Sequence, residues 1–500
     1  MTMEKKRRHT HTLNFILIFF MLFLVGTRTA HTQTILTLEK ALEIARENSP
    51  NIRSTRLNLE RSQELLNAQR AALKSQFSFR FNPFNFSQDR TFYTPFSAWT
   101  TNKTKGSTST FTISQPIKQT DGTLALTNRL SWQDSYSDYK DVRNISYSNN
   151  LAISFQQPIF TYNRTEMSTR QLELDLESTT LTYNLQKLSL ERQVTSNFYS
   201  VYQNKTSLEI AQGELENQKQ SYEIIKNKVD AGLQALEELY QAELNLASSQ
   251  SNLQNRQVSL ENSLDNFKLL IGLPLNETIT VDTDVTYQEV KVDLDKALET
   301  GLKNRLEMRQ QNISMENAQY SLIQTAAQNE FKGNVTLSYG IIGTDENFGN
   351  MFEVPTKQQT IGLSFDIPIW DWGQKKSRIN ASRASIERNK ISLEDERNSI
   401  IMEITQTYRS LNNLVNQIEI ARQNVRNAEL TYEINLERYK NGDLTSMDLN
   451  LFQSQLSQKR NGYVQALISY KLALLDMKIQ SLWDFERNQP VLPELTNDLK

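Results

Sequence analysis

Leu151-Ala-Ile-Ser-Phe-Gln-Gln-Pro-Ile-Phe160 recurs 210 positions later as Ile361-Gly-Leu-Ser-Phe-Asp-Ile-Pro-Ile-Trp370. The same offset carries Gly232 onto Gly442. Farther upstream, Leu38-Glu-Lys-Ala-Leu-Glu43 recurs 256 positions later as Leu294-Asp-Lys-Ala-Leu-Glu299. The two offsets differ by 46 residues, so the first copy carries an insertion of that size before Leu151. A direct duplication of this kind indicates one architecture built twice.

Each copy follows the same plan of helix, strand region, long helix, glycine turn and helix. We expect the first repeat over residues 36–275, a linker over 276–291 and the second repeat over 292–486. The insertion falls in the first repeat, and we expect it to form an extra β-hairpin loop at about 83–148. Residues 487–500 contain two prolines, and we expect an irregular C-terminal tail there.

The N-terminus carries a basic cluster at residues 5–8, an apolar run over 13–25 and small residues after it. This pattern predicts a signal peptide over 1–32, and a retained membrane anchor is the alternative. The chain has no cysteine, and its three histidines, His9, His11 and His31, lie in or beside this segment. Without the commonest general base and thiol nucleophile, we expect no enzyme, no catalytic or metal site and no cofactor. The net charge of −2 gives no sign of nucleic-acid binding.

The long helices are the next feature. Residues 163–230 contain no proline and one glycine, and residues 374–440 contain neither, so each predicts a rod of roughly 100 Å. Apolar positions recur at alternating spacings of four and three before and after Gly232 and Gly442, which predicts two antiparallel coiled-coil hairpins. The glycines suit helix C-caps at the tip turns. The narrow apolar stripes fit either a free-standing stalk or a wall of neighbouring helices.

Between the helices lie strands with one apolar and one polar face. Leu151, Ile153 and Phe155 alternate with small or polar residues, and 361–369 shows the same period of two. Membrane barrel strands have this length and alternation, although half-buried strands of a soluble sandwich share the pattern. Aromatic residues that suit the membrane interface follow at the strand ends: Phe160, Tyr162, Trp370 and Trp372. Four such strands cannot close a barrel alone, so several copies of the chain must pool them.

These features together resemble the TolC-type outer-membrane efflux channel family over 36–483. The carrying motifs are the duplicated plan, the Leu-Glu-Lys-Ala-Leu-Glu opening with Asn48-Ser-Pro50, the junction prolines Pro158 and Pro368, and Tyr439-Lys-Asn-Gly442-Asp-Leu-Thr-Ser-Met-Asp448-Leu449. The resemblance implies a mainly α fold with membrane β-barrel strands: a homotrimer with a twelve-stranded barrel and a long α-helical periplasmic tunnel. It implies outer-membrane lipid, a periplasmic adaptor (membrane fusion) protein and an inner-membrane pump of the RND, ABC or MFS type as partners.

By the same resemblance, Tyr439 lies where a gating tyrosine lies, and Glu238 and Asp448 lie where acidic residues line the periplasmic entrance. The family pattern has a basic residue and a second acid where this chain has Leu444 and Leu451. Each assignment has a structural alternative. The two acids also suit the first turn of a helix, and a tyrosine on the seam also suits the core.

The insertion contains two alternating runs around Asp121-Gly122, which predict a β-hairpin. Because the second copy lacks it, we expect an extracellular projection, with two extra barrel strands as the alternative. The predicted function is the exit duct of a tripartite efflux pump or type I secretion system, which passively conducts small molecules or polypeptides across the periplasm and outer membrane. The alternative is a structural periplasmic coiled-coil or adaptor protein without a pore.

Overall fold

The computed structural model describes residues 34–139, 141–282 and 286–491. The predicted signal peptide, and part of the predicted linker and tail, lie outside these residues. The chain forms two compact units, and both contain segments of both repeats. Unit 1 comprises residues 1–50, 189–289 and 410–475, and unit 2 comprises the rest. The repeats therefore lie side by side within each unit instead of forming separate domains.

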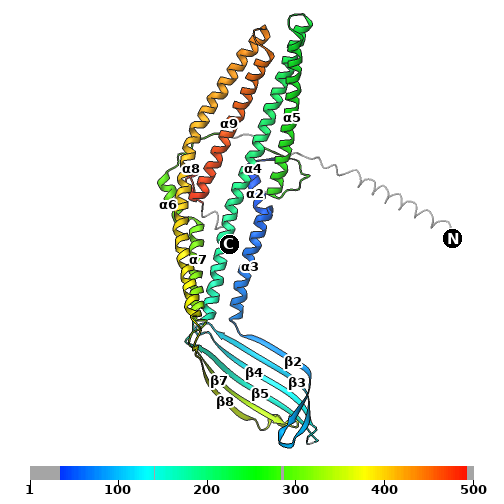
Figure 1. Ribbon diagram of the computed structural model, residues 1–500, viewed down its shortest axis with the longest axis vertical. Helices are drawn as coiled ribbons and strands as arrows, with labels where there is room; N and C mark the ends of the chain where they lie inside the picture. Colours follow the sequence, from blue (N-terminus) through cyan, green and yellow to red (C-terminus); the bar gives the residue numbers. More distant parts are fainter. Residues whose placement is uncertain (1–33, 140, 283–285, 492–500) are drawn as a thin grey trace, which may run out of the picture. The chain divides into compact units, whose positions relative to one another are not determined.

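Unit 1 is built around two helical hairpins (Figure 1). α4 (Arg164–Asp230) turns into α5 (Leu236–Ile271), and α8 (Gln374–Asn441) turns into α9 (Ser446–Ser481). The predicted seams are buried at intervals of seven residues, as Ala211, Gln218 and Ile225 show in α4. α2 (Leu38–Asn48) and the parallel pair β1 (Thr34–Leu36) and β6 (Ile279–Val281) complete this unit.

The hairpins of unit 1 contact each other along α4 and α9. Side-chain hydrogen bonds join Asn217 to Gln453 at 3.0 Å and Gln218 to Asn450 at 3.0 Å. Nearer the tips, one apolar cluster contains residues of all four helices, including Ile225, Ala242 and Tyr432. α4 thus has neighbours on two sides, and this arrangement matches a wall of helices rather than a free-standing stalk.

Unit 2 contains the shorter helices and the large sheet. Its helices are α3 (Pro50–Ala72), α6 (Leu294–Asn304), α7 (Leu306–Ala326) and the first parts of α4 and α8. The guanidinium of Arg309 on α7 donates to both carboxylate oxygens of Glu177 on α4, at 2.6 and 2.8 Å. Arg305 donates to Glu307 and to Glu403 on α8. The Arg309–Glu177 pair ties helices of the two repeats together, whereas Arg305 joins the start of α7 to α8 within the second repeat.

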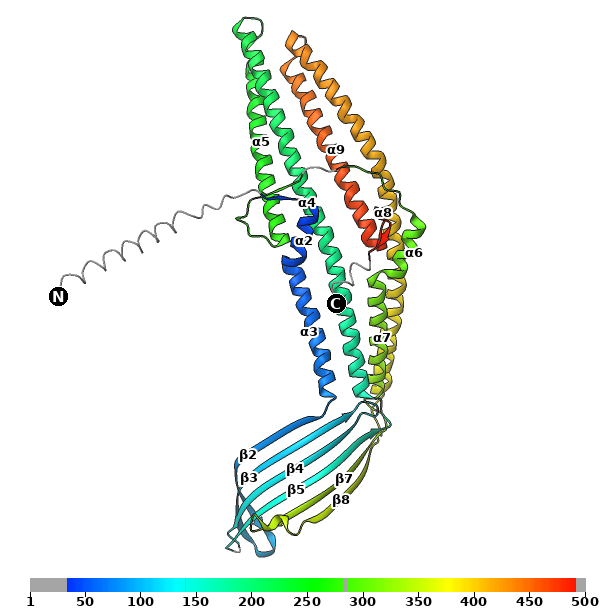
Figure 2. The same ribbon diagram turned by 180° about the vertical axis from the view of Figure 1, so that it is seen from behind.

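The large sheet has six antiparallel strands in the order β2-β3-β4-β5-β7-β8 (Figure 2). Their bounds are β2 Gln76–Tyr93, β3 Ala98–Ile117, β4 Gly122–Ser137, β5 Val142–Ile159, β7 Lys332–Asp345 and β8 Thr356–Asp366. β2 and β8 are the two open edges. Two 3₁₀ turns, η1 (Thr94–Phe96) and η2 (Asn350–Phe352), lie in the connections.

The expectation of an extracellular projection at 83–148 is wrong, and so is the count of four strands per chain. The insertion supplies β3 and β4, which pair in continuous register with β2 and β5 on either side. The physical reason is hydrogen bonding: a hairpin inserted between two antiparallel strands satisfies its backbone groups best by joining the sheet.

The described part of the predicted irregular tail, residues 487–491, is ordered. β10 (Gln489–Pro490) pairs with β9 (Trp483–Asp484), and Val491 is buried in a cluster with Leu188 and Leu482. Among the described residues, no helix has both the length and the apolar composition to cross a bilayer.

Candidate channel wall and entrance

One face of the large sheet is apolar across its width. Residues directly opposite each other in antiparallel strands point to the same face. One such row runs Phe77, Ile113, Leu126, Ile153 and Tyr339, through β2, β3, β4, β5 and β7 in turn. Most of this face is exposed, Phe77 at 68%. The apolar residues of the inserted strands β3 and β4 pair with apolar residues of the neighbouring strands β2 and β5.

The opposite face consists of small and polar residues. Its central row runs Ser78, Thr112, Thr127, Ala152 and Gly340. A glycine suits the last position because a Cβ on Gly340 would meet Ala152 and the Leu151 carbonyl at 3.0 Å. The sheet therefore has one surface suited to lipid and one suited to water, which is the pattern of a membrane barrel wall.

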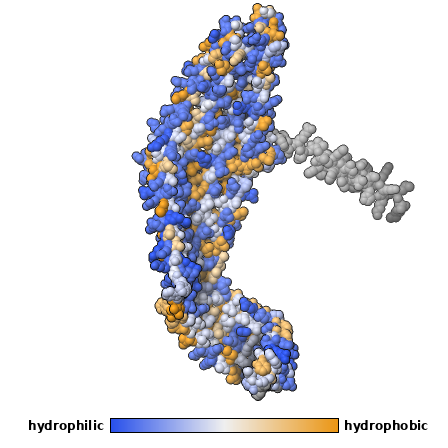
Figure 3. Space-filling model, viewed as in Figure 1, coloured by the Kyte–Doolittle hydropathy of each residue, from blue (hydrophilic) through white to orange (hydrophobic). Residues whose placement is uncertain are grey.

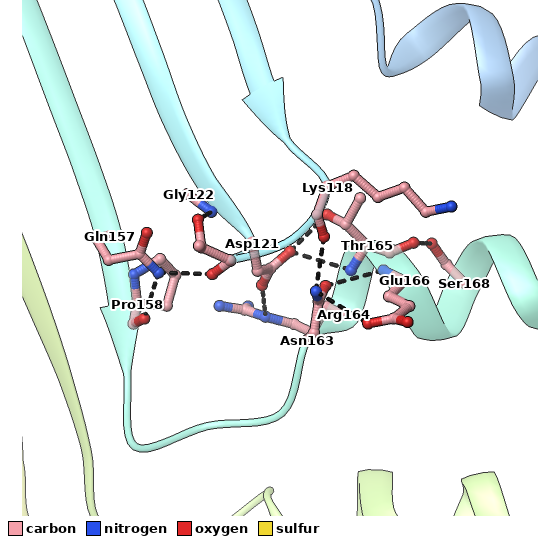
Figure 4. A network of polar contacts seen from close by, with 11 residues as sticks. Lys118, Asp121, Gly122, Gln157, Pro158, Asn163, Arg164, Thr165, Glu166 and Ser168 are labelled. Atoms are coloured by element: carbon pink, nitrogen blue, oxygen red, sulfur yellow. Dashed lines mark hydrogen bonds and ion pairs between the residues drawn. The ribbon is translucent and has the colours of Figure 1, made fainter.

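The turn between β3 and β4 lies where β5 leads into α4 (Figure 4). The Asp121 carboxylate accepts hydrogen bonds from the backbone N–H of Thr165, at 3.0 Å, and from Arg164. Asn163 caps the helix by accepting from the Glu166 N–H at 2.9 Å, and its amide nitrogen donates to the Lys118 carbonyl. The insertion thus returns to the helix end of the sheet and anchors the start of α4.

The predicted junction residues lie beside these connections. Pro158 is the second-last residue of β5. Its carbonyl accepts from the side-chain amide of Gln157, which also donates to the Thr120 carbonyl. β8 ends at Asp366, three residues before the end of the alternating pattern at 369. Pro368 therefore lies just after the strand. The hollow next to it has a volume of about 560 Å³ and is lined by Trp370 and Trp372, among others.

The junction aromatics are largely exposed. Phe160 is 61% exposed, Trp370 74% and Trp372 90%, whereas Tyr162 is half-buried. The two tryptophan rings contact edge to face at 5.6 Å. In Figure 3 a hydrophobic patch lies where β7 and β8 meet the helices, and smaller patches lie among hydrophilic surface on the sheet. The position of the four aromatic residues at the strand ends is compatible with the predicted role at the membrane interface, which stays a prediction.

Both tip glycines adopt the left-handed backbone that was expected of them. Gly232 has φ +73° and Gly442 has φ +91°. Each follows a long helix, and its N–H donates to the carbonyl three residues earlier, Val229 and Tyr439 respectively. These turns reverse the chain without the cost that a β-carbon would add.

Tyr439 lies buried between the two hairpins, with 1% of its surface exposed. Its hydroxyl contacts the Ser221 carbonyl on α4 at 3.2 Å and the Ser446 hydroxyl at 3.3 Å. Burial raises the pKa of the Tyr439 hydroxyl, and the hydrogen bond with Ser446 lowers it by a smaller amount. Lys228 on α4 donates to the Tyr439 carbonyl at 3.0 Å. The tyrosine is therefore both a core residue and a polar link between the hairpins.

The two acids at the tips play different local roles. The Glu238 carboxylate, on the first turn of α5, accepts from the backbone N–H of Ser446 at the start of α9, 3.1 Å away. Asp448 forms a reciprocal cap with Thr445: its carboxylate accepts from the threonine hydroxyl at 2.7 Å, and its N–H donates back at 3.1 Å. Both acids thus fit the helix-start alternative, and Asp448 remains exposed for a second role.

Sequence reasoning missed Lys228 and Ser446. Lys228 connects α4 to the tip turn of the second hairpin, and Ser446 contacts both Tyr439 and Glu238. A lysine in the last turn of a helix and a serine at the first turn are both explained by helix ends alone. Only the packing of one hairpin against the other gives them their cross-links.

Comparison with known proteins supplies the family. The model of the family described as outer membrane efflux protein matches residues 122–273 and 297–478, more than half of the chain. This chain belongs to that family. The family description agrees with the resemblance that the sequence motifs indicate.

Several relatives of this outer membrane efflux protein are known. The cation efflux system protein CusC of Escherichia coli strain K12 is 22% identical over 251 residues, which are 48% of this chain and 52% of CusC. The chain thus spans about half the length of the curated relatives it matches. Among solved structures, the CmeC outer membrane channel of Campylobacter jejuni has a TM-score of 0.69 at 14% identity, over 93% of this chain and 90% of CmeC. VceC of Vibrio cholerae gives 0.65 at 15% identity, over 88% and 94%. These structures establish a shared fold.

Proposed function

We propose that this outer membrane efflux protein is the exit duct of a tripartite pump or type I secretion system. The observation that carries the proposal is the large sheet, which has one apolar face, one small polar face and two open edges. An open edge leaves backbone groups unpaired, which lipid does not tolerate. The sheet must therefore close with further strands, and the long helices continue from its ends.

The closing partners are further copies of the same chain. β8 of one copy pairs with β2 of the next, and three copies complete a cylinder with cyclic symmetry. Within that assembly, the apolar face meets lipid and the polar face lines the pore. The homotrimer and the docking of a periplasmic adaptor and an inner-membrane pump follow the family resemblance, and the cargo passes passively.

The tips of the hairpins form the periplasmic gate. Lys228, Glu238 and Tyr439 hold the first hairpin against the second inside each copy. Opening then requires these three links to break together, as the second hairpin moves away from the first. Asp448, exposed near the same tip, gives the entrance a ring of negative charge when three copies meet.

A matched pair of substitutions in one strand tests the membrane role of the sheet. Phe79→Asp puts a charge on the apolar face, whereas Ser78→Asp puts the same charge on the polar face next to it. A carboxylate on the lipid face of a barrel is destabilising, and one on the lumen face is solvated. We expect Phe79→Asp to disappear from the outer-membrane fraction and Ser78→Asp to remain there as a heat-modifiable oligomer. Equal recovery of both variants from the membrane would refute the proposal.

A further inference from the structure

Two arginines lie in one row on the polar face of the large sheet. The row runs Arg80 on β2, Thr110 on β3, Arg129 on β4 and Asn150 on β5. Directly opposed residues share a face, so both guanidinium groups project from the side that also carries Ser78 and Thr127. Two strand spacings separate them, about 10 Å. Arg129 belongs to the insertion that the second repeat lacks.

Neither guanidinium group is neutralised. Within the described residues, Arg80 and Arg129 have no ion-pair or hydrogen-bond partner. The polar face carries no acidic residue in the four rows that begin at Gln76, Ser78, Arg80 and Asn82. Arginine keeps its charge at every physiological pH. This stretch of the face therefore has a fixed positive charge.

The opposite face provides a contrast. Lys103 and Lys105 on β3 lie opposite Tyr136 and Asp134 of β4, in register with the apolar residues. The Asp134 carboxylate also accepts two hydrogen bonds from the Arg143 guanidinium, at 2.8 and 2.7 Å. On the apolar face, Lys105 thus has an acidic neighbour, whereas no acidic residue lies in the row of Arg80 and Arg129.

We propose that Arg80 and Arg129 form a belt of positive charge around the membrane pore and favour anionic cargo, with phosphate or carboxylate groups. The inference rests on the proposed closed assembly, in which three copies bring six guanidinium groups to one height of the lumen. Rings of arginine or lysine select anions in other pores. The insertion contributes half of the belt.

The insertion also sets the width at which the belt acts. With six strands per copy, three copies make an eighteen-stranded barrel instead of the twelve strands expected from the sequence. Barrel diameter grows roughly linearly with strand number, so this pore is about one and a half times wider.

Planar bilayers containing the purified full-length assembly test the belt. The reversal potential under a tenfold KCl gradient gives the ratio of chloride to potassium permeability. We expect Arg80→Gln with Arg129→Gln to lower that ratio about sevenfold, because one kT of lost potential changes chloride and potassium partitioning about 2.7-fold each in opposite directions. Lys103→Gln with Lys105→Gln removes the same charge from the other face, and we expect it to leave the ratio unchanged.

Inorganic tripolyphosphate added on the barrel side provides a second readout close to the belt. It should reduce the current through the wild type and the lysine variant, but not through the arginine variant. An unchanged ratio and equal block in the arginine variant would overturn the belt, and so would equal losses in both variants. If the wild type conducts no current, the duct itself fails, which is a different result from a duct without anion preference.

Discussion

Tyr439→Phe is the substitution that most directly tests the hairpin contact as a gate. It deletes one hydroxyl, which contacts the Ser221 carbonyl at 3.2 Å and the Ser446 hydroxyl at 3.3 Å, and it leaves the ring in place. Only the Ser221 contact joins the two hairpins, because Ser446 belongs to the same hairpin as Tyr439. The hydrogen bond that opening breaks is therefore worth about 0.5–1.5 kcal/mol per chain. That free energy changes the ratio of closed to open tips by roughly 2- to 12-fold.

Single-channel recording measures the open fraction, and Tyr432→Phe is the matched control. Tyr432 is buried in the same apolar cluster, and its hydroxyl makes no hydrogen bond within the described part of the chain. We expect Tyr439→Phe to open more often and Tyr432→Phe to behave as the wild type, with similar thermal stability in detergent. If both variants open equally often, or neither changes, the hydroxyl of Tyr439 does not hold the tips closed.

Three further predictions concern the same helices. Lys228→Met removes the charged donor to the Tyr439 carbonyl, a hydrogen bond worth about 1.5–3 kcal/mol. We therefore expect more open events than in Tyr439→Phe, and fewer open events would contradict a closing role for Lys228. Asp448→Asn, alone or with Glu238→Gln, should weaken divalent-cation block of conductance about fivefold, the effect of roughly 1 kcal/mol of charge attraction, and an unchanged blocking constant would remove the acidic ring. Burial raises the pKa of Glu214, so the folded protein holds this proton more tightly than the unfolded chain and loses stability as the pH rises through the raised value. The melting temperature of Glu214→Gln should therefore fall less between pH 4 and pH 8 than that of the wild type, and parallel curves would refute the assignment.

The helical half of the fold follows directly from the sequence. The glycine turns, the long uninterrupted helices and the buried seams depend on local signals: a missing β-carbon, the absence of proline and a repeating apolar stripe. Tyr439 and Glu238 follow from the family resemblance, which assigns them through the motifs around the tip turns. The sequence does not identify their partners Lys228 and Ser446, because a contact between two hairpins is tertiary and produces no repeating pattern in the sequence.

The sheet shows where comparison of repeats misleads. Phe111 and Ile113 on β3, and Leu124 and Leu126 on β4, alternate as clearly as the strands that were assigned to the membrane. The absence of these residues from the second repeat suggested a projection outside the barrel. A β-strand pattern specifies which face is apolar, but the pairing partner depends on register. Figure 4 shows that the turn at Asp121 lies beside the start of α4, where its carboxylate accepts from the Thr165 N–H.

The account depends most on the closure of the six-stranded sheet by further copies of the chain. The direct measurement is a strand count and subunit count by electron microscopy of the detergent-purified, full-length assembly. We predict three copies around one closed barrel of eighteen strands, with β8 of each copy beside β2 of the next. A water-soluble single chain, or a barrel in which β3 and β4 lie outside the wall, would contradict it.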